Sequence, residues 1–167
     1  MAATPAVVIE RRLSIAGSTA WSSQPSVLVL LRVAPGLDVA ALGRGIEAAF
    51  EPLLEGQAVQ AAPEEGAAGL VARMAVALLD AHGLPVFDRP RPMATPAGLL
   101  RVVIATQAGQ HKLGQAILAA VVDAVCAIGA GEPAAPAVEV AKAALERLAQ
   151  EAPTGKNMLS MLRAAHA

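Results

Sequence analysis

The sequence predicts an α+β fold in which helices pack on one face of a small β-sheet and a helical tail follows. Short runs rich in Val, Leu and Ile are typical of strands, and longer segments repeat their apolar residues at helical spacing. These segments occur in the order β-β-α-α-β-α and are followed by two more helices. With so few strands, stacking the helices on one face is the natural way to bury the sheet.

Three segments have the composition of strands. Residues 6–15 are apolar with a charged middle, and residues 26–33 (SVLVLLRV) are a nearly continuous branched apolar run. Residues 98–106 (GLLRVVIAT) have a similar character. Runs of this length and composition are typical of strands, and the near-continuous apolar run over 26–33 suits a buried one.

Helices are predicted where apolar residues recur every three or four positions. The first begins after Asp38, a good N-cap residue, and the second begins near Glu64 and Glu65, whose charges suit the positive end of a helix. Gly83 ends the second helix. Further helices are predicted over residues 111–128, 137–150 and about 156–166.

The length and composition of the chain indicate one core with an extension. Of the 167 residues, 55% are hydrophobic and 16% are charged, which fits a single domain of ordinary size. We expect an α+β domain over residues 1–130 and a helical extension over 131–167. Residues 87–97 contain three prolines and predict an exposed, non-helical connection.

The charge pattern excludes a nucleic-acid-binding surface. The net charge is −1 and no basic block occurs, whereas such a surface needs clustered Lys and Arg to neutralise phosphates. Only Trp21, Phe50 and Phe87 are aromatic, so the stacking platform of single-strand binders is also missing. We find no secretory leader and no charge-free apolar stretch of about 20 residues. We therefore expect a cytoplasmic protein that does not span a membrane.

No motif for catalysis, metal binding or a cofactor is recognisable. Gly109 and Gly114 have the spacing of a phosphate-binding loop, but Gln115 and Ala116 stand where such a loop has Lys and Ser or Thr. We expect a turn glycine and a small residue at a helix–strand contact instead. The three histidines are far apart, nothing supplies a base for a serine nucleophile, and Cys126 lies in an apolar helical pattern that predicts a buried thiol.

Three residues are the candidates for a binding surface. Trp21, the one tryptophan, lies in a polar loop between two predicted strands, where it either contacts a ligand or closes one end of the sheet. Arg89 and Arg91 lie on a proline-stiffened segment, which lowers the entropic cost of presenting guanidinium groups to carboxylates. Solvation is the alternative for both arginines. Arg101 or Lys112 assists them if the fold brings either one close.

The order of the segments resembles the N-terminal domain of cyanophycin synthetases, the ligases that polymerise aspartate and arginine. In that family an early strand enters a G-P-N-x-W-S-like turn and then an apolar strand. Here IAGSTAWSS supplies Gly17, Trp21 and Ser22, and SVLVLLRV follows. A glycine-led second helix and a G-x-P-V-like exit come next, and Gly69 followed by LVARMAVALLDAHGLPV matches them. The later stretch RVVIATQAGQHKLGQAILAAVVDAV matches the family's next strand and its helix of small residues.

The sequence also departs from the family pattern. Many members carry H-x-x-E-H on the second helix, an arrangement suited to a metal and an acid–base carboxylate. The corresponding stretch here, Leu70 to Met74, contains no His and no Glu. The family's third strand is commonly followed by acidic residues, whereas ATQAGQ is neutral. The ATP-grasp and Mur-ligase-like domains that perform ligation do not occur in these 167 residues.

The resemblance implies a non-catalytic domain that tethers the growing polypeptide or otherwise assists an ATP-dependent ligase. The expected partners are an ATP-grasp or Mur-type ligase or its polypeptide product. The chain is then either free-standing or a fragment of a larger ligase. The alternative is a structural subunit that only stabilises an assembly, and a homo-oligomer is compatible with either hypothesis. An independent enzyme has the least support.

Overall fold

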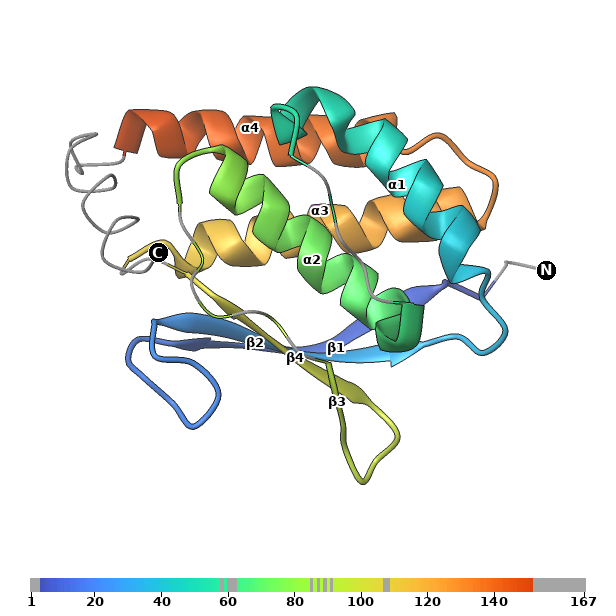
Figure 1. Cartoon of the computed structure of the whole chain (residues 1–167), viewed down its shortest axis with the longest axis horizontal. Coiled ribbons are helices and arrows are strands. Elements are labelled where there is room, and N and C mark those ends of the chain that lie inside the picture. Colours follow the sequence, from blue (N-terminus) through green and yellow to red (C-terminus); the bar gives the residue numbers. More distant parts are fainter. Residues whose placement is uncertain are drawn as a thin grey trace.

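A four-stranded antiparallel sheet with helices on one face forms the fold (Figure 1). The computed structural model describes residues 4–57, 59, 63–84, 86, 88, 90, 92–106 and 109–151. The strands are β1 (Val7–Ile15), β2 (Ser26–Val33), β3 (Met93–Ala94) and β4 (Leu100–Ala105), in the spatial order β1-β2-β4-β3. The helices are α1 (Val39–Leu54), α2 (Gly66–Ala81), α3 (His111–Gly129) and α4 (Ala135–Glu151). The predicted α+β class is confirmed.

The helices form two layers above the sheet. α2 and α3 pack directly on the strands, whereas α1 and α4 pack mainly on α2 and α3. Val27, Val29 and Leu31 of β2 are completely buried beneath this layer. Ala141 and Leu145 of α4 belong to the same hydrophobic core, so α4 packs on the main fold.

The two glycines with phosphate-loop spacing have structural roles. Gly109 has φ +81°, a left-handed turn conformation that favours glycine. Gly114 lies where α3 approaches the sheet, and a Cβ atom there would lie 2.7 Å from Thr106 Cγ2 and 3.3 Å from Val27 Cγ2. The small residue therefore allows the helix to pack closely on β2 and the end of β4.

α3 has the length and composition of a membrane-crossing helix. Among the described helices it is the one that meets both criteria, and half of its most apolar window is buried inside the fold. Cys126 of α3 is partly rather than fully buried, which corrects the predicted burial, and its Sγ donates a hydrogen bond to Val7 O at 3.1 Å. These properties are those of a central core helix.

The structure differs from the sequence-based expectation between α2 and β4. Residues 87–97 contain a short strand, β3, whose Met93 and Ala94 pair with Arg101 and Leu100. Two paired residues leave no periodic pattern, so the prolines dominated the prediction. A 3-10 turn over Pro63–Glu65 precedes α2, which places Gly69 inside the helix rather than at its start. The helix predicted over residues 156–166 lies outside the described residues.

Candidate functional site

The candidate site is the face of the sheet that the helices leave open. Val27 and Val29 face the helical layer, so the alternation of side chains places Leu28 and Leu30 on the opposite face. The strand register then defines two rows of residues on this open face. One row is Arg11, Leu30, Arg101 and Met93, and the next is Leu13, Leu28 and Val103. A row with two arginines therefore lies beside an apolar row.

Trp21 packs against this face through Arg101. The Arg101 guanidinium carbon lies 4.4 Å from the centroid of the Trp21 ring, which is within the range of a cation–π contact. The Trp21 side chain is nevertheless 45% exposed. The structure thus brings Trp21 and Arg101 together, and Arg101 is one of the two cations expected to assist if the fold allowed it. No described contact joins the other, Lys112, to Trp21.

The charge of Arg101 is not neutralised by a carboxylate among the described residues. Its Nη2 approaches Met93 Sδ at 3.8 Å, and its Nε is buried without a hydrogen-bond acceptor. In contrast, Arg32 at one end of the open face pairs with Glu10 at 2.8 Å. Arg11 has no acidic partner in the described part of the chain either. The middle of the open face is therefore positively charged.

A second contact ties the Trp21 loop to a distant segment. Asp88 Oδ2 accepts hydrogen bonds from Ser22 Oγ at 2.9 Å, Ser23 Oγ at 2.9 Å and Ser23 N at 2.8 Å. Burial raises the pKa of Asp88, but the hydrogen bonds from Ser23 and Ser22 together lower it by more, so the pKa lies below the ordinary aspartate value. Asp88 is therefore a stable anion at neutral pH.

The remaining predicted site residues, Arg89 and Arg91, lie outside the described residues. Their sequence neighbour Asp88 contacts Ser22 and Ser23, which are next to Trp21. Sequence reasoning missed Arg11 and the role of Asp88. The alternation of β1 was a usable signal for Arg11, whereas no local pattern connects Asp88 with a loop 65 residues away.

α2 holds an ion pair near Leu70–Met74, the stretch that corresponds to the H-x-x-E-H motif of the cyanophycin synthetases that the sequence resembles. Leu70, Val71 and Met74 are buried in the core, and Arg73 is held by Glu65 through hydrogen bonds of 2.5 and 2.7 Å. No group of three His, Cys, Asp or Glu residues that could hold a metal ion occurs in the described part of the chain.

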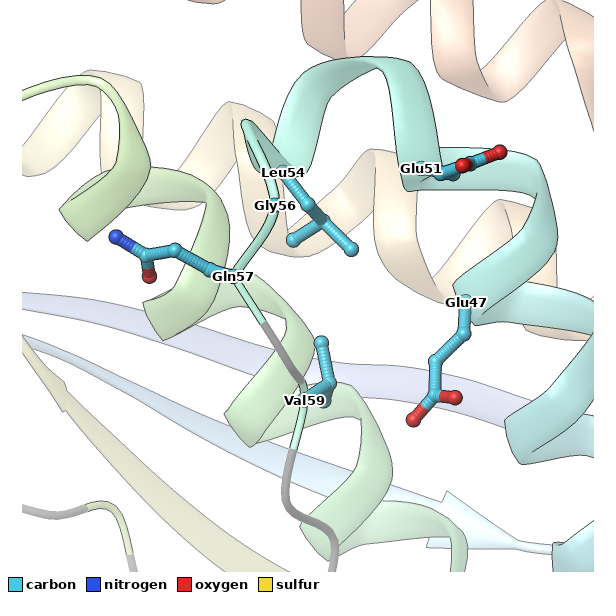
Figure 2. A pocket seen from close by; sticks show the side chains of 6 residues that line it. All are labelled: Glu47, Glu51, Leu54, Gly56, Gln57 and Val59. Atoms are coloured by element: carbon cyan, nitrogen blue, oxygen red, sulfur yellow. The ribbon is translucent and has the colours of Figure 1, made fainter.

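Two surface cavities lie away from the open face. The first, of about 360 Å³, lies beside the C-terminal half of α1 and the segment that follows it. Figure 2 shows Glu47 reaching toward Val59, whereas the Glu51 carboxylate points away from it. The two carboxylates therefore do not converge on one point. The second cavity, of about 520 Å³, is lined by Thr4–Ala6 and the end of α3, including Asp123 and Cys126.

Comparison with known proteins adds no family assignment to this geometry. No protein family matches the chain, and no curated protein sequence matches it significantly.

Proposed function

We propose that this chain is a non-catalytic accessory domain that holds a carboxylate-bearing polypeptide for an ATP-dependent ligase of the cyanophycin synthetase kind. One observation carries the proposal. Trp21 is half-exposed and stacks on Arg101, whose charge has no carboxylate partner in the described residues, on a sheet face that none of the described helices covers. Such a pair offers a ligand a positive charge and an aromatic surface together.

The strand register supports a ligand with more than one carboxylate. Arg11 and Arg101 share a row and are separated by one strand, β2. Their Cα atoms are therefore about 10 Å apart, because neighbouring strands are about 4.8 Å apart. Guanidinium groups bind carboxylates in a planar, bidentate manner. The sequence also nominates Arg89 and Arg91 for carboxylate binding, and the structure shows only that their neighbour Asp88 contacts Ser22 of the Trp21 loop.

The described groups around Ser22 and Ser23 support a non-catalytic role, because they include no strong base. Asp88 contacts the hydroxyls of Ser22 and Ser23, but a carboxylate whose pKa is lowered is a weak base. His82 Nδ1 lies 3.1 Å from Leu78 O on α2, so it does not complete a triad with them. The surface is therefore better suited to binding than to proton transfer.

Calorimetric titration with soluble cyanophycin-like peptides tests the proposal. We expect binding that weakens as salt is raised, because exposed charges are screened within about 8 Å at physiological ionic strength. Arg101→Gln should weaken it, and the double variant Arg89→Ala, Arg91→Ala should do the same. Arg44→Gln is the matched control, since Arg44 is an exposed arginine on α1. Binding that ignores both salt and Arg101→Gln would contradict the proposed surface.

The second candidate is a structural subunit of a ligase assembly. Its contacts would be exposed apolar side chains, of which Leu13 on the open face is 43% exposed and Val140 on α4 is 57% exposed. This candidate predicts tight binding to a cognate ATP-grasp ligase and no binding of the peptides. Leu13→Ser and Val140→Ser should then weaken ligase binding, whereas Arg101→Gln should matter little.

A further inference from the structure

The loop between β1 and β2 is held over the sheet by one carboxylate from a distant part of the chain. Three donors from Ser22 and Ser23 converge on a single oxygen of Asp88, at 2.8 to 2.9 Å. Hydrogen bonds to an ionised acceptor are stronger than those between neutral groups. Ser22 is buried although it lies in a polar loop, so its bond to Asp88 is partly shielded from water, whereas the two bonds from Ser23 are exposed.

The loop itself is a compact turn that includes Trp21. Thr19 Oγ1 accepts hydrogen bonds from the backbone N–H groups of Trp21 and Ser22, both at 3.1 Å. The Thr19 N–H donates to Ser22 O at 2.7 Å. Because these bonds make residues 19–22 one unit, fixing Ser22 in place also fixes the backbone of Trp21.

We propose that Asp88 is a positioning residue for the binding surface, which holds Trp21 on Arg101 by anchoring Ser22 and Ser23. This inference rests on the proposed function for the identity of the ligand, but not for the anchor itself. Without the Asp88 carboxylate, Ser22 loses its long-range partner, and the Trp21 ring is free to leave the guanidinium. Arg101 then remains charged but loses the aromatic plane that orients it.

A positioning role and a purely electrostatic role of Asp88 predict opposite changes in peptide affinity when its charge is removed. Asp88 is an anion beside a surface that binds carboxylates, so a purely electrostatic role means that removing its charge tightens peptide binding. A positioning role means the reverse for Asp88→Ala, which removes every acceptor. Asp88→Asn keeps an amide oxygen that accepts hydrogen bonds from the same donors. It should therefore retain the position of Trp21 and most of the affinity.

Fluorescence provides a readout that needs no ligand, because Trp21 is the only tryptophan. We expect Asp88→Ala to shift the emission to longer wavelength and to increase quenching by iodide, while Asp88→Asn stays near the parent protein. The double variant Ser22→Ala, Ser23→Ala keeps the backbone N–H donor of residue 23, so its Trp21 emission should lie between those of Asp88→Ala and Asp88→Asn. Circular dichroism melting checks that each variant is folded. If Asp88→Ala does not fold, the emission of Asp88→Asn and Ser23→Ala tests the proposal in its place.

Peptide titration of the same variants completes the test. Asp88→Ala should weaken binding by about two- to fivefold, the loss expected when one exposed cation–π platform is disordered. Unchanged emission in Asp88→Ala would overturn the proposal, as would tighter peptide binding by both Asp88 variants. If the parent protein binds no peptide, the proposed function fails, and the emission of the variants still decides whether Asp88 positions Trp21.

Discussion

The two faces of the central strand β2 have opposite surroundings. Val27, Val29 and Leu31 face α2 and α3 and are completely buried. Leu30, one position away, faces the open side, where it lies between Arg11 and Arg101. The covered face is close-packed through small residues such as Gly114. On the open side Leu28 is also buried, whereas Leu30 and Arg101 are half-buried and Trp21 is 45% exposed. Substitutions of Leu31 and Leu30 should therefore differ in their cost to stability.

The largest effect is expected on the covered face. Leu31→Ala should lower the free energy of unfolding by about 2–5 kcal/mol, because it removes a fully buried side chain and leaves a cavity. Urea denaturation measures this loss. Leu30→Ala is the matched control, since the same deletion falls on a half-buried residue of the open face and should cost clearly less. Equal losses for both would contradict the division between the faces.

The contact of α3 with the sheet should give the next largest effect. Gly114→Ala places a Cβ atom 2.7 Å from Thr106 Cγ2, and overpacking of this kind costs about 1–3 kcal/mol. Gly43→Ala on α1 is the matched control, because its Cβ would meet only Leu70 Cδ1, at 3.9 Å. There alanine should stabilise the helix by about 0.5–1 kcal/mol. Thermal melting that moves both variants in the same direction would refute this reading of the contact.

The sequence predicted the covered face better than the open one. β2 and α3 were placed within one residue of their observed bounds, because branched apolar runs and helical periodicity are local signals. Asp38 caps α1 as predicted, with its Oδ1 accepting from Ala41 N at 2.9 Å. The contacts of Trp21 with Arg101 and of Asp88 with Ser22 depend on register and on loop paths. No periodicity within one segment contains that information, so only the three-dimensional structure reveals these pairs.

Acid should weaken the anchor that Asp88 provides. The pKa of Asp88 is lowered in the folded protein, so its contribution to stability is present above the ordinary aspartate pKa and is lost as pH falls through the lowered value. The groups facing its carboxylate are the hydroxyls of Ser22 and Ser23 and the backbone N–H groups of Ser23 and Gln24. The free energy of unfolding of the parent protein should therefore fall at low pH, whereas Trp21 emission should change little before unfolding, because a protonated carboxyl keeps an acceptor oxygen as the Asn amide does. In Asp88→Asn this loss of stability should be missing, and its persistence would point to another titrating group.

The smallest effect on stability is expected from a pair of adjacent arginines in β1. Arg11 and Arg12 are both exposed, but the alternation of β1 places Arg11 on the open face and Arg12 on the other side. Replacing either with Gln should change the free energy of unfolding by no more than about 0.5 kcal/mol. Only Arg11→Gln should weaken peptide binding and reduce its salt dependence. If Arg11→Gln and Arg12→Gln weaken peptide binding equally, the positive charge of β1 contributes to binding whichever face of the sheet carries it.

The position of β2 between β1 and β4 also has a consequence for how the chain acquires its structure. β1 precedes β2 by a short loop, so these two strands can form a hairpin early, whereas β4 pairs with β2 only after α1, α2 and β3 have been synthesised. Until then the apolar run SVLVLLRV has one unpaired edge, and such edges promote association between chains. Chains truncated before Leu100 should therefore aggregate. The late synthesis of β4 therefore delays the pairing of the second edge of β2, and β4 is the strand that covers this apolar edge.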